Sequence, residues 1–192
     1  PALLFHNGLS NLFTFLKQIR GFPDDINENS TRDQFLFYTE YSLQQSAGAK
    51  SIGVTIDTPS GETPDIIIEI LKPTRTLVVI EAKMFQNLTQ GKFDEQIKDQ
   101  RRSILNPLKD KFRIPNSHMF HVALVPSQLN FTVREDYQVL TWDFFLDNNY
   151  LDVESSYFHG FLKYALDNYD RLVADGGTGS WGQASTVKGH MK

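Results

Sequence analysis

Two apolar segments that follow each other closely in the chain constrain its fold more than any other feature. Residues 65–71 contain the run Ile66-Ile67-Ile68, and residues 76–83 read Thr-Leu-Val-Val-Ile-Glu-Ala-Lys. Both segments are predicted to be β-strands, joined by a turn at residues 72–75. Since they are apolar almost throughout, rather than at every second residue, they predict a sheet that is covered on both faces.

The remaining apolar pattern predicts helices and further strands around this pair. Helices are predicted over residues 3–19, from residue 26 or 30 to 45, over 92–105, from the aromatic block at 142–145, and over 157–172; strands are predicted at 51–58, 119–125 and 138–141. The fold class that follows is α/β: a mixed sheet with an antiparallel meander (51–58, 65–71, 76–83), a crossover helix and a further strand, flanked by helices.

Two of these helices carry specific expectations. The second begins near a candidate capping box, Ser30-Thr31-Arg32-Asp33, and would bury a stripe of apolar side chains. That stripe consists of Phe35, Leu36, Thr39 and Leu43. The C-terminal helix would bury Phe158, Phe161, Leu162, Ala165, Leu166 and Tyr169.

Length and composition indicate one globular domain. Of the 192 residues, 40% are hydrophobic and 22% are charged, which is enough for an independent core. We expect this domain at residues 1–174 and a flexible, glycine-rich tail or linker at 175–192. The lack of cysteine excludes disulfides and zinc–thiolate sites. No apolar run reaches the roughly 20 residues of a membrane span, and residues 1–22 lack a signal-peptide pattern, so we expect a cytoplasmic protein without a membrane partner.

Charged residues at the ends of the two buried strands predict a catalytic site. Glu81 and Lys83, two residues apart on one strand, project to the same face. Asp65 opens the neighbouring strand and should lie beside Ala82. A simple turn would place Asp65 on the opposite face from Glu81, whereas a bulge or an odd-length loop would bring the two carboxylates together. Carboxylates suit Mg²⁺ or Mn²⁺, and a nearby lysine can stabilise charge on a phosphate.

The pattern Pro64-Asp65 followed by Glu81-Ala82-Lys83 resembles that of the PD-(D/E)XK nuclease superfamily. The resemblance covers roughly residues 25–142 and implies a restriction-endonuclease-like fold. It further implies a hydrolase: a Mg²⁺- or Mn²⁺-dependent endonuclease that cleaves DNA in restriction, antiviral (phage) defence or repair. Asp65, Glu81 and the carbonyl of Ala82 would bind the metal, and Lys83 would be the catalytic lysine.

The same resemblance implies two further site residues. A glutamate from the first core helix would be Glu28, at the helix entrance, with Glu40 as the alternative. A glutamine from the helix after the lysine strand would be Gln96.

Each assignment has a simpler structural reading. Glu81 and Lys83 would be an exposed ion pair, Asp65 a turn residue, Glu28 a helix cap and Gln96 a solvent-facing residue. Lys98, Arg101 and Arg102 would either contact nucleic-acid phosphates or form a solvated helix face. His118 and His121 are expected to be structural or exposed.

The net charge of −4 disfavours a dedicated nucleic-acid binder, although a local basic patch suffices for phosphate contacts. The alternative function is a catalytically inactive nucleic-acid-binding or assembly module of the same fold. The chain is also compatible with a homodimer or with one domain of a larger protein.

Overall fold

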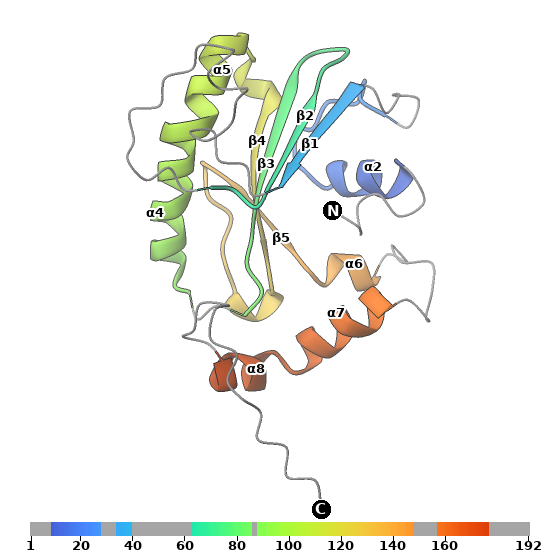
Figure 1. Cartoon of the computed structure of the whole chain (residues 1–192), viewed down its shortest axis with the longest axis vertical. Helices are drawn as coiled ribbons and strands as arrows, with labels where there is room; N and C mark the ends of the chain where they lie inside the picture. Colours follow the sequence, from blue (N-terminus) through green and yellow to red (C-terminus); the bar gives the residue numbers. More distant parts are fainter. Residues whose placement is uncertain (1–8, 28–33, 40–62, 86–87, 148–156, 177–192) are drawn as a thin grey trace, which may run out of the picture.

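The computed structural model describes residues 9–27, 34–39, 63–85, 88–147 and 157–176, which form an α/β fold (Figure 1). A five-stranded sheet has the order β1-β2-β3-β4-β5. Its strands are β1 (Phe35–Thr39), β2 (Ile66–Ile70), β3 (Thr76–Ala82), β4 (Met119–Val125) and β5 (Gln138–Thr141). The first three are antiparallel neighbours, whereas β4 runs parallel to β3 and β5 parallel to β4. The predicted mixed sheet flanked by helices is therefore confirmed, but the strand paired with the outer edge of β2 is 35–39 rather than the predicted 51–58.

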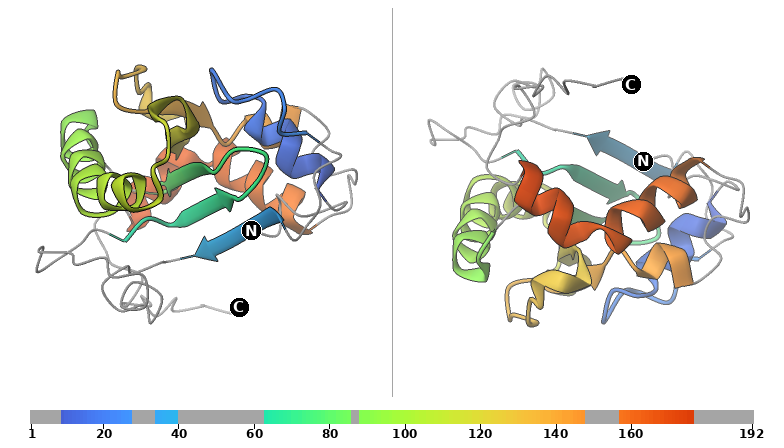
Figure 2. Two further views of the ribbon diagram at one scale, coloured as in Figure 1. Left: turned by 90° about the horizontal axis from the view of Figure 1, so that it is seen from above. Right: turned by 90° about the horizontal axis from the view of Figure 1, so that it is seen from below.

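Helices cover both faces of this sheet. They are α2 (Ser10–Leu16), α4 (Gln90–Gln100), α5 (Asn106–Phe112), α6 (Phe144–Asp147), α7 (Tyr157–Asp167) and α8 (Tyr169–Gly176). A π-helical turn, η2 (Arg101–Leu105), joins α4 to α5, so the predicted helix over 92–105 is part of a longer helical segment. Figures 1 and 2 show α4 and α5 on one face of the sheet and α2 on the other. Within the described residues, no helix has both the length and the apolar content needed to cross a membrane.

The strands bury side chains in two cores, one on each face of the sheet, as their nearly continuous apolar sequences predicted. Even-numbered residues such as Ile68 and Ile80 pack in the core on the α2 side, with α6 and α7. Odd-numbered residues such as Ile67 and Val79 pack against η2 and α5, and Ala123 packs against α4. An odd-numbered residue of β2, β3 or β4 therefore faces the α4–α5 side.

Residues 35–39 form strand β1, so the helix predicted across them is wrong. Phe35 and Phe37 pack in the α2-side core and Tyr38 against the α5-side core, while Leu36 is 38% exposed. This is close to an alternation of faces. Aromatic side chains suit a strand, and backbone pairing with β2 supplies hydrogen bonds that local propensity does not reveal. The capping box, Leu43 and the strand predicted at 51–58 lie outside the described residues.

The terminal helices differ in extent from the predictions. Within the described residues, the first helix ends at Leu16 rather than at residue 19, and Asn168 separates α7 from α8. Leu162, Ala165, Leu166 and Tyr169 are buried as predicted. The predicted burial of Phe158 and Phe161 is wrong, since they are 50% and 51% exposed. The buried stripe of α7 runs through its second half, and its first turn extends past the core.

Candidate active site

The β2–β3 hairpin places Asp65 and Glu81 on the same face of the sheet. Ile70 pairs with Thr76, so five residues separate the paired ends of the strands. Ile66 pairs with Ile80, and one further step along this register sets Asp65 opposite Glu81. The predicted position of Asp65 beside Ala82, on the opposite face from Glu81, is therefore wrong. The alternative, in which an odd-length loop brings the two carboxylates to the same face, is the one observed. Both residues are odd-numbered and face α4.

The backbone at the end of the hairpin holds Asp65 in place. Its Oδ2 accepts a hydrogen bond of 2.7 Å from the N–H of Ala82. A further step of the register would set Ala82 opposite Pro64, which has no N–H to donate. The ladder therefore cannot continue there through an N–H of residue 64. The Asp65 carboxylate accepts the hydrogen bond from the Ala82 N–H instead. The Ala82 carbonyl points to the same side of the strand, and Pro64 cannot donate a hydrogen bond to it.

Glu81 is a buried carboxylate surrounded by donors. Its side chain is 1% exposed. One oxygen, Oε1, accepts from the Lys83 ammonium and from Gln96 Nε2 at 2.7 Å, and the other, Oε2, accepts from Gln100 Nε2 at 2.6 Å. Burial raises the pKa of Glu81, and the negative charge of Asp65 raises it further, although Lys83 and Gln100 act in the opposite direction. A second carboxylate therefore lies close enough to Glu81 to repel its charge.

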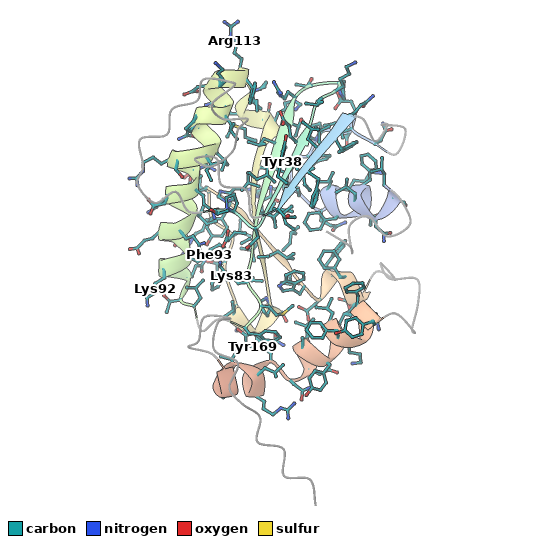
Figure 3. The ribbon with its side chains drawn as sticks, in the orientation of Figure 1. Tyr38, Lys83, Lys92, Phe93, Arg113 and Tyr169 are labelled. Atoms are coloured by element: carbon teal, nitrogen blue, oxygen red, sulfur yellow. The ribbon has the colours of Figure 1, made fainter. Side chains whose placement is uncertain are left out.

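Lys83 belongs to the same buried cluster. Its side chain is only 11% exposed and forms an ion pair with Glu81, which excludes the reading of a solvated surface pair. The backbone of Lys83 is fixed on both sides, because its N–H donates to Leu124 (2.9 Å) and its carbonyl accepts from the indole N–H of Trp142 (2.8 Å). Figure 3 shows Lys83 where β3 ends, in the region between the sheet and α4.

Helix α4 supplies two amides to this cluster. The hydroxyl of Thr89 caps its first turn by accepting from the N–H of Lys92. Gln96 and Gln100 lie one turn apart and so reach Glu81 together. Gln96 was predicted, and the structure brings it into contact with Glu81. Gln100 was missed, although its spacing of four residues from Gln96 was a usable signal.

A buried histidine extends the cluster behind Gln100. His121 of β4 is 3% exposed, and its Nε2 lies 2.9 Å from Gln100 Oε1. Burial, together with the positive charge of Arg101, lowers the pKa of His121 to about 3, so the ring is neutral at physiological pH. Sequence reasoning expected a structural or exposed histidine. The structure shows a buried one, linked to Glu81 through a single amide.

The other predicted residues either lie outside the described residues or are not part of this cluster. Glu28 and Glu40 lie outside the described residues, and the helix that Glu28 was expected to open is replaced at residues 35–39 by strand β1. Lys98 is exposed on α4. Arg101 forms an ion pair with Asp136 (3.5 Å) and Arg102 with Asp99 (2.9 Å), so two of the three basic residues already have acidic partners.

A pocket lies on another side of α4. It is lined by Asp94, Ile97, Lys98, Arg134, Glu135, Asp136 and Tyr137. It shares no residue with the cluster formed by Asp65, Glu81 and Lys83, so we do not assign the chemistry to it.

The donor set of the cluster fits a hard divalent cation. In the described part of the chain, no group of three or more His, Cys, Asp or Glu side chains is placed to hold a metal. Asp65 and Glu81 nevertheless offer carboxylate oxygens on one face, and the Ala82 carbonyl lies on the Asp65 side of β3. Mg²⁺ commonly takes one or two carboxylates and completes its shell with water and phosphate oxygens. The repulsion between Asp65 and Glu81 is the kind of charge imbalance that a cation offsets.

Comparison with known proteins leaves this cluster as the main guide to function. Asp65, Glu81, Lys83 and Gln96, all named from the sequence, meet at one end of β3. No family model, curated protein or solved structure matches the chain.

Proposed function

We propose that this chain is a metal-dependent nuclease of the PD-(D/E)XK type that hydrolyses phosphodiester bonds of DNA. The observation that carries the proposal is the contact of Lys83 and Gln96 with Glu81, beside Asp65, at the end of a buried hairpin. The sheet gives further support. An antiparallel β1-β2-β3 meander, followed by a helical crossover to parallel β4, is the arrangement expected of a restriction-endonuclease-like fold.

In this proposal the residues of the cluster have different roles. Asp65, Glu81 and the carbonyl of Ala82 would hold Mg²⁺ or Mn²⁺, which would polarise the phosphate and lower the pKa of a bound water. Gln96 keeps Glu81 oriented by donating to its Oε1. Lys83 places a positive charge beside the phosphate, where it stabilises the negative charge that grows as the nucleophile attacks.

The buried ion pair explains how Lys83 would be kept ready for this role. Its ammonium contacts Glu81 Oε1, and its backbone is bonded to Leu124 and Trp142. An ammonium at this position would need no large movement to interact with a phosphate at the metal that Asp65 and Glu81 would hold. Preorganised charge of this kind contributes more to rate than a mobile surface lysine does.

The direct test is cleavage of three substrates under three metal conditions. Supercoiled plasmid, single-stranded DNA and RNA are each incubated with the purified chain in Mg²⁺, in Mn²⁺ and in EDTA. We expect cleavage of DNA with either metal and none with EDTA. Asp65→Ala should abolish cleavage, whereas Lys92→Ala, a change at an exposed position of α4, should not.

Other results would contradict the proposal or change its substrate. Cleavage that persists in EDTA, or in Asp65→Ala, would contradict the assigned metal site. Tight nucleic-acid binding without cleavage in any metal would instead support the non-catalytic module of the same fold. Cleavage of RNA alone would retain the mechanism and change the substrate.

A further inference from the structure

A chain of hydrogen bonds runs from the candidate metal site into the core of the protein. Gln100 Nε2 donates to Glu81 Oε2 (2.6 Å), and Gln100 Oε1 lies 2.9 Å from His121 Nε2. Glu81, Gln100 and His121 are at most 3% exposed. They come from β3, α4 and β4, so the packing of α4 on the sheet aligns them.

The direction of these bonds is determined by the carboxylate. An ionised carboxylate only accepts hydrogen bonds, so Gln100 must turn its NH₂ group toward Glu81. Its carbonyl oxygen then faces His121 and can only accept. His121 must therefore carry its proton on Nε2 and donate to Gln100, which leaves Nδ1 without a proton.

The other ring nitrogen is consistent with this assignment. His121 Nδ1 is buried and has no hydrogen-bond partner among the described residues. A protonated Nδ1 at this position would be a buried donor without an acceptor, which is costly. The reverse arrangement of the amide would also place its oxygen against the Glu81 carboxylate. Both ends of this chain of hydrogen bonds, Glu81 and His121, thus favour one tautomer of His121 and one orientation of the Gln100 amide.

We propose that Gln100 and His121 are positioning residues for Glu81, with the Nε2–H of His121 locking the Gln100 amide so that it offers a donor to the metal-binding carboxylate. The proposal rests on the proposed function, since positioning matters for metal binding. Lys83 and Gln96 both donate to Oε1, whereas Gln100 donates to Oε2. Without Gln100, Oε2 would lose this donor and the rotamer of Glu81 would be less restricted.

The expected size of the effect follows from metal sites in general. Loss of an outer partner that orients a metal ligand typically costs about 10- to 100-fold in metal affinity or activity. We expect Gln100→Met, which keeps the length of the side chain and removes the amide, to weaken Mn²⁺ binding by about this factor. The loss should appear in kcat and in metal affinity, and the KM for DNA should change little.

The first measurement uses the metal-free protein and needs no activity. Two-dimensional ¹H–¹⁵N NMR of the histidine side chains, with His121→Phe identifying the resonance, reports which nitrogen carries the proton. The expected result is the Nε2–H tautomer at neutral pH. An Nδ1–H tautomer would overturn the proposal, because Gln100 could not then accept from Nε2.

The second measurement compares Mn²⁺ binding, by calorimetry or electron paramagnetic resonance, in matched variants. Gln90→Met is the control, because the Gln90 amide lies on the same helix and bonds Thr132 and Tyr137 instead of Glu81. Gln100→Met should weaken Mn²⁺ binding and Gln90→Met should not. Equal affinities for wild type and Gln100→Met would overturn the proposal. Circular dichroism and the Tm of each variant show whether it is folded.

A double-mutant cycle shows whether His121 acts through Gln100. His121→Phe should weaken Mn²⁺ binding in the wild-type background and add little in the Gln100→Met background. Additive losses would show that His121 acts independently and would refute its role. If His121→Phe does not fold, triple-resonance assignment of the wild type identifies the His121 signals, and the NMR tautomer and the Gln100→Met comparison decide the question. If the wild type neither binds Mn²⁺ nor cleaves DNA, the proposed function fails, and the tautomer alone decides whether the chain of bonds exists as described.

Discussion

Glu69 and Glu81 sit at opposite ends of the same hairpin, and their surroundings differ sharply. Both are buried carboxylates on the α4–α5 side, at 9% and 1% exposure. Glu69 pairs with Arg75 at 2.7 Å, and the guanidinium of Arg75 lies 3.7 Å above the ring of Phe112. Glu81 contacts one lysine and two amides and lies beside a second carboxylate.

The difference lies in the balance of charge. At the Glu69 end, one carboxylate meets one guanidinium, and the pair ties the hairpin turn to α5. At the Glu81 end, the one ammonium contacts Glu81, and a second carboxylate, Asp65, lies near enough to raise the pKa of Glu81. A balanced pair contributes to structure and needs no ligand. Under the proposed function, a bound cation would offset the excess of negative charge at the Glu81 end.

The largest expected effect tests the lysine at the Glu81 end. Lys83→Ala should lower DNA cleavage by about 10²–10³-fold, because it removes charge stabilisation that is strongest in the transition state. The fold and Mn²⁺ binding should be largely retained. Single-turnover cleavage rates and Mn²⁺ titration measure the two effects, with Lys92→Ala as the control. Near-normal cleavage by Lys83→Ala would show that this lysine is only an ion-pair partner.

The next prediction compares variants at the Glu81 end and the Glu69 end of the hairpin. Asp65→Asn keeps an oxygen that can accept from Ala82 and removes one negative charge, so Mn²⁺ affinity should fall about 100-fold or more. Stability should stay the same or rise, since repulsion of Glu81 is relieved. Glu69→Gln should leave Mn²⁺ binding unchanged and destabilise the fold by about 1 kcal/mol, because the Arg75 pair is partly buried.

Calorimetric Mn²⁺ titration and urea unfolding of both variants measure this contrast. If Glu69→Gln lost Mn²⁺ affinity as strongly as Asp65→Asn, the two ends would not differ in the way described.

A smaller effect concerns how the stability of the fold depends on pH through His121. The pKa of His121 is lowered from 6.5 to about 3 in the folded protein, so between these values the unfolded chain binds a proton that the folded chain does not. Stability from this group is complete above pH 6.5 and is lost as pH falls toward 3. By pH 5 the loss is about 2 kcal/mol.

Urea unfolding of wild type and His121→Phe between pH 7.5 and 5 measures this loss as a difference between the two profiles. The variant should lose less stability than the wild type over this range. Parallel profiles would mean that His121 is protonated in the fold as readily as in the unfolded chain.

The smallest expected effect lies on the outer side of α4. Replacing Lys98, Arg101 and Arg102 with alanine should weaken DNA binding on every sequence and reduce the slope of log affinity against log salt by about one to three units. Lys98→Ala alone should account for about one unit, because the two arginines have acidic partners. Fluorescence anisotropy at several salt concentrations gives the slope. An unchanged slope in the triple variant would remove α4 from the DNA interface.

Local pattern was sufficient for most of the described fold. Strands β2, β3, β4 and β5 and the helical segment that begins with α4 follow from apolar runs and helical spacing within each segment. Strand β1 was missed because Phe35, Leu36 and Thr39 also fit helical spacing over so short a segment. Its pairing with β2, far along the chain, decided the outcome.

What the sequence determined by itself was which chemical groups stand at the ends of which strands: Asp65 after Pro64, and Glu81 two residues before Lys83. These follow from covalent order and the two-residue period of a strand. Only the tertiary structure decided that the carboxylates share a face, because this depends on the odd number of residues in the β2–β3 connection. It also decided that Gln100 reaches Glu81 and that His121 reaches Gln100, since contacts between α4, β3 and β4 arise from packing across the sheet, which no local pattern encodes.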